Sequence, residues 1–215
     1  MKKIFLFLWL AVMFVGHAQD NAVPKPQYVN WGLAIGPSAT TFVMQMPFSF
    51  SEPLQAQPGL GLELGGYMDF NLSPLWIMQF SFMLGCERVY LVNGTIDDVL
   101  MPHTIDMALK FGLRMPLGKW HMLLSAGPYS QFTYACPTVG PSHLENPFTR
   151  QINEDGDMAL NDFHSGAALS FGLETSEGWQ WMLNYGICLT NLLNFRNSNS
   201  YLLPHKLSFV VGRRF

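Results

Sequence analysis

The sequence predicts an all-β protein: an eight-stranded antiparallel up-and-down transmembrane β-barrel preceded by a signal peptide. Three observations lead to this prediction. Apolar residues recur at every second position in eight segments, short and long connections alternate between those segments, and a short apolar stretch follows two lysines near the start. Only 13% of the 215 residues are charged, against roughly 25% in soluble domains. A well-solvated charged surface is therefore excluded, and the net charge of −3 gives no basic footprint for nucleic acid.

The N-terminal segment has the three parts of a secretory signal peptide. Two lysines begin it, residues 4–15 are apolar, and a small-residue cleavage site follows directly. The apolar run is too short for a membrane-spanning helix, which needs about 20 residues. We expect residues 1–18 to be removed and residues 19–215 to form one barrel domain in the outer membrane of a Gram-negative bacterium.

Eight segments have the period-two pattern of a sheet with two different faces. In approximate bounds they span residues 31–43, 59–70, 75–88, 105–115, 120–134, 163–174, 179–190 and 205–215. Their apolar faces include, in the same order, Trp31, Leu33 and Ile35; Leu60, Leu62 and Leu64; Trp76, Met78 and Phe80; Ile105, Met107 and Leu109; Trp120, Met122 and Leu124; Phe163, Ala167 and Leu169; Trp179, Trp181 and Leu183; and Leu207, Phe209 and Val211. The opposite face of each segment is small or polar. A helix would scatter these residues around its circumference, so strands are expected.

The connections between these segments alternate in length. The short ones are residues 71–74, 116–119 and 176–178, which contain the Gly, Pro, Asn and Ser that tight turns favour. The long ones are residues 44–58, 89–102, 135–161 and 191–204. Short turns at one rim and long loops at the other are typical of outer-membrane barrels, with the turns periplasmic. Within the second long connection, Asn93 and Gly94 predict the tip of a hairpin.

Side-chain size indicates which face points outward. The interior of an eight-stranded barrel is only wide enough to be filled by side chains, so the bulky Leu, Phe, Trp and Met residues cannot all point into it. Five tryptophans lie on the apolar face near the periplasmic strand ends, where an interfacial girdle is expected. The predicted membrane-interface girdle is Trp31, Trp76, Trp120, Trp179 and Trp181. Outer-membrane lipid is therefore an expected partner.

The inner face carries charges of both signs. In a narrow, poorly hydrated lumen, opposite charges must pair or carry a large desolvation penalty. We therefore expect a lumen charge network that fills the barrel. Its members are Glu63, Asp69, Glu87, Asp106, Lys110, Arg114, Glu174, Lys206 and Arg214. A proton or ion path along these residues is the alternative, although eight strands leave little room for a continuous pore.

The histidines predict no catalytic site, and no metal-ligand spacing is present. His121 and His164 are expected to point inward. Neighbours on a strand point to opposite faces, so His164 and Ser165 cannot form a base and nucleophile pair. A pairing of His164 with Asp106 or Ser125 across the lumen stays open.

Three cysteines are expected near the extracellular rim: Cys86, Cys136 and Cys188. Cys86 with Cys136 could close the second and third long loops, whereas Cys188 is expected to point inward. An odd count gives no disulfide framework, so the disulfide state is left open.

The architecture resembles the PorT-like small outer-membrane β-barrels of Bacteroidota. The resemblance rests on the signal peptide, the eight alternating strands with glycine-rich inner faces, and the final strand that ends in aromatic Phe215. Phe215 resembles the assembly signal by which the barrel-assembly machinery recognises its clients, so that machinery is an implied partner. One PorT-like protein is a component of the type IX secretion system, and most have no assigned role.

We expect a structural or interaction protein, not an enzyme, with an accessory role in protein secretion or envelope assembly as its most concrete form. Two alternatives stay open. An outer-membrane enzyme that modifies lipid A would need His121 or His164 within hydrogen-bond reach of a hydroxyl at the bilayer interface. A small-ligand-binding barrel would need an open cavity at its extracellular mouth. No cofactor is expected.

Overall fold

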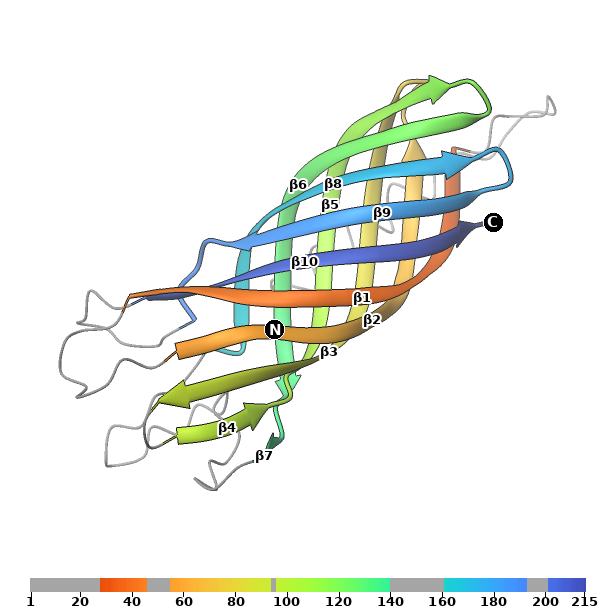
Figure 1. Cartoon of the computed structure of the whole chain (residues 1–215). Coiled ribbons are helices and arrows are strands. Elements are labelled where there is room, and N and C mark those ends of the chain that lie inside the picture. Colours follow the sequence, from red (N-terminus) through yellow and green to blue (C-terminus); the bar gives the residue numbers. More distant parts are fainter. Residues whose placement is uncertain (1–27, 46–54, 94–95, 140–160, 193–200) are drawn as a thin grey trace.

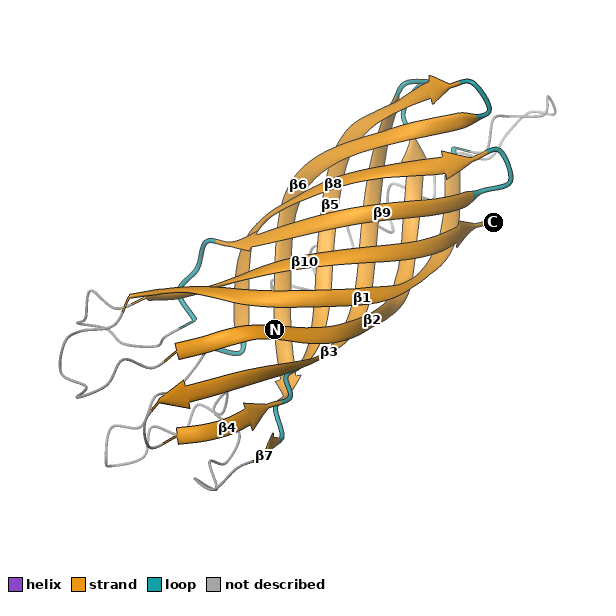
Figure 2. Ribbon diagram, viewed as in Figure 1, coloured by secondary structure: helices purple, strands orange, loops and turns teal. Residues whose placement is uncertain are grey.

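The computed structural model describes residues 28–45, 55–93, 96–139, 161–192 and 201–215. The strands are β1 (Val29–Gln45), β2 (Gln55–Asn71), β3 (Trp76–Asn93), β4 (Ile96–Leu100), β5 (His103–Leu117), β6 (Trp120–Ala135), β7 (Thr138–Val139), β8 (Phe163–Thr175), β9 (Trp179–Cys188) and β10 (Tyr201–Arg214). Figure 2 shows these strands joined by turns and connections. In the described ranges there is no helix long and apolar enough to cross a membrane. The expected signal peptide lies outside these ranges.

Eight of the strands form a closed antiparallel barrel (Figure 1). Their order around the wall is β1, β2, β3, β5, β6, β8, β9 and β10, and β10 pairs again with β1. Neighbours in the wall therefore follow the chain order, as in an up-and-down barrel. The predicted eight-stranded antiparallel up-and-down barrel is confirmed.

The three predicted short turns lie at one end of the barrel, after β2, β5 and β8 (Figure 1). Gly118 and Gly178 have φ angles of 63° and 84°, a left-handed conformation that glycine adopts without a steric penalty. In the turn between β2 and β3, the Ser73 hydroxyl accepts a hydrogen bond from the Trp76 N–H at 2.9 Å. Local turn chemistry therefore produces the tight reversals at this end, which we call the turn side.

At the opposite end, the loop side, several strands are longer than expected. β1 and β2 have 17 residues each and β3 has 18, whereas a membrane crossing needs about 9–11. The loops predicted at residues 44–58 and 191–204 are therefore too long, because strands occupy part of each range. Ladder pairing keeps these ends extended, because β1 pairs with β10 as far as Gln45 with Tyr201, and β2 pairs with β3 as far as Gln55 with Val92.

β3 continues past the barrel wall and forms a hairpin with β4. The ladder runs from Val89 with Leu100 to Asn93 with Ile96, which confirms the predicted hairpin. β7 adds to the free side of β4 in a second, short pairing. Val89, Leu100 and Cys136 form a small buried cluster at its base. An apolar cluster, against which Phe42 of β1 also packs, thus stabilises this loop-side hairpin (β3, β4 and β7).

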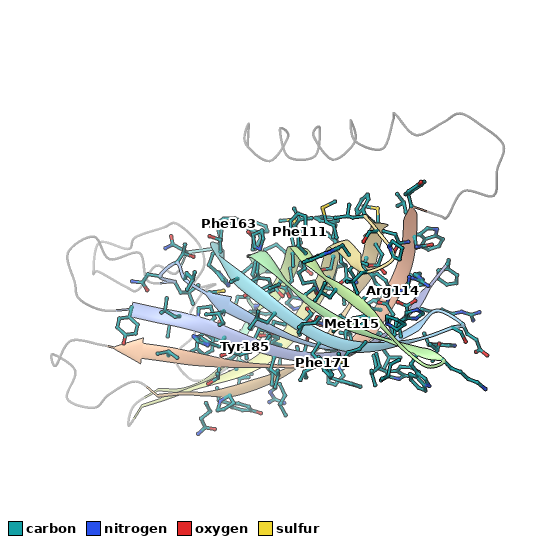
Figure 3. The ribbon with its side chains drawn as sticks, turned by 90° about the horizontal axis from the view of Figure 1, so that it is seen from above. Phe111, Arg114, Met115, Phe163, Phe171 and Tyr185 are labelled. Carbon is teal, nitrogen blue, oxygen red and sulfur yellow. The ribbon has the colours of Figure 1, made fainter. Side chains whose placement is uncertain are left out.

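The two faces of the barrel wall have opposite character. Outward-facing Leu62 and Leu64 are 64% and 55% exposed, whereas Glu63 between them is 4% exposed. The same alternation continues around the wall, where Phe111, Phe163 and Phe171 are exposed on the outer surface (Figure 3). Apolar side chains therefore cover the outside, and the charges face the lumen.

The inward face is less uniformly small and polar than expected. Five large apolar side chains also point into the lumen and are buried there. They are Ile77, Met83, Leu123, Met182 and Val210, which pack with Ala34 and Tyr67. Alternation along a strand predicts only to which face each side chain points. The lumen of an eight-stranded barrel must be filled by the side chains that point into it, and these include apolar ones.

Candidate functional site: the charged lumen

Lys206 of β10 lies at the centre of a buried cluster of three carboxylates. Its Nζ atom is 2.5 Å from Asp106 Oδ2 and 2.9 Å from Glu87 Oε1. Glu63 Oε2 lies 3.3 Å away. All four residues are buried, and they come from β2, β3, β5 and β10. We call Glu63, Glu87, Asp106 and Lys206 the Lys206 cluster.

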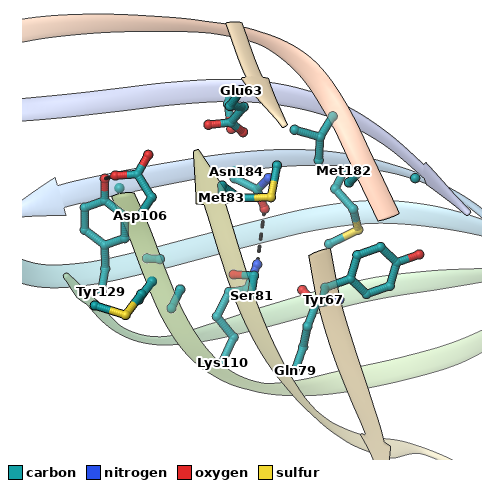
Figure 4. A pocket seen from close by; sticks show the side chains of 18 of the residues that line it. Glu63, Tyr67, Gln79, Ser81, Met83, Asp106, Lys110, Tyr129, Met182 and Asn184 are labelled. Carbon is teal, nitrogen blue, oxygen red and sulfur yellow. Dashed lines mark hydrogen bonds between the residues drawn. The ribbon is translucent and has the colours of Figure 1, made fainter. Parts of the chain in front are cut away.

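Neutral hydroxyls complete this cluster. Tyr129 Oη donates to Asp106 Oδ1 at 2.8 Å, as the close-up in Figure 4 shows. Ser38 Oγ donates to Glu87 Oε1 at 3.4 Å. These donors matter because three carboxylates share one cation, so each carboxylate needs further hydrogen bonds to offset its lost hydration.

Glu174 of β8 lies at the centre of the reverse arrangement near the turn side. Its Oε1 atom is 2.6 Å from Arg114 Nη2 and 2.5 Å from Arg214 Nη2. The Glu174 side chain is 1% exposed, and each arginine side chain is 17% exposed. Here two partly hydrated cations hold one buried carboxylate. We call Arg114, Glu174 and Arg214 the Glu174 cluster.

Amide side chains join the Glu174 cluster to the last lumen carboxylate, Asp69. Gln180 Nε2 lies 3.1 Å from Asp69 Oδ2 and 3.4 Å from Glu174 Oε2. Gln79 Nε2 donates to Asp69 Oδ1 at 2.8 Å. Asp69 is thus stabilised by amide donors and makes no ion pair with a cation of the described chain.

Lys110 lies between the two clusters and has no carboxylate within ion-pair distance among the described residues. Its Nζ atom donates to Ser170 Oγ at 2.9 Å and to Asn184 Oδ1 at 3.3 Å. Figure 4 shows Lys110 reaching across the lumen to Asn184. Ser170 and Asn184 are also bonded to one another at 2.6 Å.

A small cavity lies beside Lys110. Its volume is about 70 Å³, and its lining includes Lys206 on one side and Gln180 on the other. Ligand pockets for drug-sized molecules have volumes of roughly 300–1,000 Å³. This space therefore fits a few water molecules and is too small for a drug-sized ligand.

All nine residues of the predicted charge network point into the lumen. Seven of them form ion pairs, Asp69 accepts hydrogen bonds from amides, and Lys110 donates hydrogen bonds to neutral partners. The sequence pattern predicts no role for the neutral partners of these charges. They are Ser38, Gln79, Tyr129, Ser170, Gln180 and Asn184. Their only sequence signal is that polar residues occupy inward positions of a strand.

The two inward histidines have no hydroxyl partner in the described chain. His164 Nε2 lies 2.5 Å from Gln131 Oε1 on the neighbouring strand, and His164 Nδ1 has no hydrogen-bond partner there. The pairing with Asp106 or Ser125 that the sequence left open is absent from these contacts. His121 Nδ1 is likewise without a hydrogen-bond partner in the described ranges.

The three cysteines are free thiols in the structure. Cys86 is exposed on the outward face of β3, whereas Cys136 is buried with Val89 and Leu100, so the pairing of Cys86 with Cys136 is not formed. Burial raises the pKa of the Cys136 thiol to about 12. Cys136 is therefore protonated and unreactive near neutral pH. Cys188 is buried and faces the lumen.

The five girdle tryptophans lie at or near the turn side, at the starts of β1, β3, β6 and β9. Trp31, Trp76, Trp120 and Trp179 are between 38% and 55% exposed. The Trp120 and Trp181 rings lie 5.5 Å apart. Phe215 follows β10, and its N–H donates to the Trp31 carbonyl at 2.8 Å while its ring lies 4.8 Å from the Trp31 ring.

No protein-family model matches this sequence, and no curated protein matches it. Solved structures similar to the chain include OprG, an outer membrane protein from Pseudomonas aeruginosa, at 10% identity with a TM-score of 0.46, covering 87% of this chain and 94% of that one. Neisserial surface protein A is 9% identical with a TM-score of 0.43, covering 86% and 97%. Ail, the attachment invasion locus protein of Yersinia pestis, is 10% identical with a TM-score of 0.42, covering 86% and 98%. With such low scores, functional conclusions have to come from this chain's own residues.

Proposed function

We propose that this chain is an integral barrel protein of the Gram-negative outer membrane, exported through a cleaved signal peptide. The observation that carries the proposal is the polarity of the wall, with apolar side chains outside and ion pairs inside. A soluble barrel has the reverse polarity, because its outside faces water. A closed ladder also satisfies the backbone hydrogen bonds that hydrocarbon cannot satisfy.

Within the membrane, the barrel acts as a structural or interaction protein. The lumen supports this part of the proposal, because an eight-stranded barrel is only wide enough to be filled by side chains, and ion-paired and apolar side chains are buried inside this one. The loop-side hairpin supports it as well, since β3, β4 and β7 build a paired element beyond the barrel wall. Surface elements of this kind are where specific contacts of a barrel lie.

The role that fits best is that of an accessory in protein secretion or envelope assembly, as the PorT-like resemblance implies. The barrel-assembly machinery would insert the chain, with Phe215 as part of the signal it reads. The loop-side hairpin would then meet an envelope or secretion protein.

The test is a pull-down of the tagged protein from cross-linked outer membranes, followed by mass spectrometry. Recovery of secretion or envelope-assembly subunits is the expected result. The control is a variant in which residues 89–100 are replaced by a two-residue turn, which removes the hairpin and leaves β3 joined to β5. We expect this control to insert into the membrane and to lose at least one partner. Absence of the wild-type protein from the outer-membrane fraction would overturn the location, and absence of any specific partner would overturn the interaction role.

A further inference from the structure

One diagonal row of outward residues crosses five strands at the turn side. The registers place Trp179 beside Arg213 and Arg213 beside Leu33. They then place Leu33 beside Gly66 and Gly66 beside Phe82. Trp179 is the first residue of β9 and Arg213 the next to last of β10, whereas Phe82 lies well inside β3. The row therefore starts at the rim and runs into the apolar part of the wall.

Arg213 is the charged end of this row. Its guanidinium lies 5.4 Å from the centre of the Trp179 ring and 5.8 Å from the centre of the Phe215 ring. Within the described residues it makes no ion pair with a carboxylate. Two aromatic rings thus hold an exposed cation at the level of the tryptophan girdle, where a bilayer presents its phosphate groups.

The apolar part of the row contains a groove. The groove has a volume of about 260 Å³, and the side chains beside it are Trp31, Leu33, Met68, Phe80 and Phe82. Gly66 forms part of its floor, and a Cβ atom built there would meet nothing closer than 3.4 Å. Among the strand glycines of the described chain, Gly66 has the most room for a side chain. The groove exists because this outward position has no side chain.

The depth of Phe82, the inner end of the row, matches one leaflet of a bilayer. Phe82 lies six positions beyond Trp76, the first residue of β3, which is about 20 Å along a strand. At the usual tilt of about 40° this is about 15 Å along the membrane normal, or roughly half of the hydrocarbon thickness. Phe82 thus lies near the depth at which the acyl chains of a single leaflet end.

We propose that this row, the Arg213 site, binds one phospholipid of the leaflet on the turn side. The lipid phosphate pairs with the Arg213 guanidinium, and one acyl chain lies in the groove over Gly66. A guanidinium donates two parallel hydrogen bonds to phosphate, and its placement between two rings fixes the direction of those donors. The inference rests on the proposed membrane location and adds a specific lipid contact to it.

The test is native mass spectrometry of the full chain folded in detergent and titrated with dioleoyl phosphatidylglycerol. We expect one tightly bound lipid, with affinity falling about tenfold in Gly66→Leu and in Arg213→Gln. Dioleoylglycerol has the same chains without phosphate and should also bind about tenfold more weakly. Inorganic phosphate should fail to displace the bound lipid, because it lacks the acyl chain.

Matched controls are Ala126→Leu, which enlarges an exposed small residue on β6, and Arg88→Gln, which removes a cation that lies over the Tyr90 ring on β3. Both should bind the lipid as the wild type does. Equal lipid binding by Gly66→Leu, Arg213→Gln and wild type would overturn the inference, and so would displacement by inorganic phosphate. Failure of the wild type to insert into phosphatidylglycerol vesicles, scored separately by heat-modifiable gel migration, would overturn the membrane location instead.

Discussion

The Lys206 cluster and the Glu174 cluster each surround one buried charged group with partners of the opposite sign, and the two central groups have opposite charges. At the Lys206 cluster one cation serves three carboxylates, and at the Glu174 cluster one carboxylate serves two cations. The central group is buried in both. Its partners differ, because the three carboxylates around Lys206 are buried too, whereas the two arginines around Glu174 keep part of their surface exposed near the rim.

This difference indicates which cluster depends more on its central residue. Removing Lys206 would leave three buried anions that repel one another, with hydroxyls as their remaining donors. Removing the charge of Glu174 would leave two guanidinium groups that can still reach water. Burying a charged group without its counter-ion destabilises the fold far more than leaving a charge unpaired where water can rehydrate it. The substitutions below test this comparison.

The largest effect is expected from Lys206→Met. Breaking a buried ion pair by removal of one partner costs about 3–5 kcal/mol, and here three carboxylates lose the same partner. The free energy of unfolding in lipid vesicles, followed by tryptophan fluorescence in urea, should fall by at least that amount. Adding Asp106→Asn and Glu87→Gln to the same chain should recover part of the loss. If the single variant unfolds like wild type, the cluster is not the main electrostatic element of the lumen.

Leu109→Arg places a charge on the outside of β5, next to inward Lys110. We expect a loss of about 2–4 kcal/mol, because a mid-strand arginine would have to enter the hydrocarbon. The same urea titration in vesicles measures it. Leu109→Met serves as the control and should change stability little. A stable arginine variant would argue that this face does not meet lipid.

Glu174→Gln should cost less than Lys206→Met, about 1–3 kcal/mol, since the two arginines remain partly hydrated and the glutamine can still accept a hydrogen bond. Equilibrium unfolding of the two variants under identical conditions gives the ratio directly. A larger loss for Glu174→Gln than for Lys206→Met would reverse the comparison between the clusters.

The smallest effect is expected from Lys110→Met. Lys110 has only neutral hydrogen-bond partners, so its replacement by methionine removes the desolvation cost of one buried charge and leaves no counter-ion within ion-pair distance unpaired. Ser170 and Asn184 keep their bond to each other. Unfolding free energy should therefore stay within about 1 kcal/mol of wild type. A loss as large as that of Lys206→Met would show that carboxylates beyond ion-pair distance depend on Lys110.

The direction of each side chain could be predicted from the sequence, because alternation along a strand is a local property. Alternation predicts Leu109 on the outer face and Lys110 on the inner face, and the structure agrees. The ion-pair partners could not be predicted. Lys206 and Asp106 are 100 residues apart on strands that are not neighbours, and they meet only because the tilt and stagger of the closed barrel bring them together across the lumen.

Strand length could not be predicted for a related reason. Beyond the expected ends, the residues of β1 and β10 have no clean alternation, and their extended shape comes from pairing with each other. The sequence predicts β4 only as one arm of the hairpin at Asn93 and Gly94, and it does not predict the short β7, because hydrogen bonding to a neighbour, and not composition, makes β7 a strand. Pairing is a property of two segments, so one segment alone does not reveal it.

The pairing of β10 with β1 also sets the timing of assembly. β1 has only one neighbour until β10 is in place, and almost the whole described chain separates the two strands. An unpaired strand edge is a template for aggregation, so β1 needs protection throughout that interval. Closing so long a loop is entropically costly and slow. Completion of the wall is thus one late event, and any delay in docking β10 prolongs the exposure of β1.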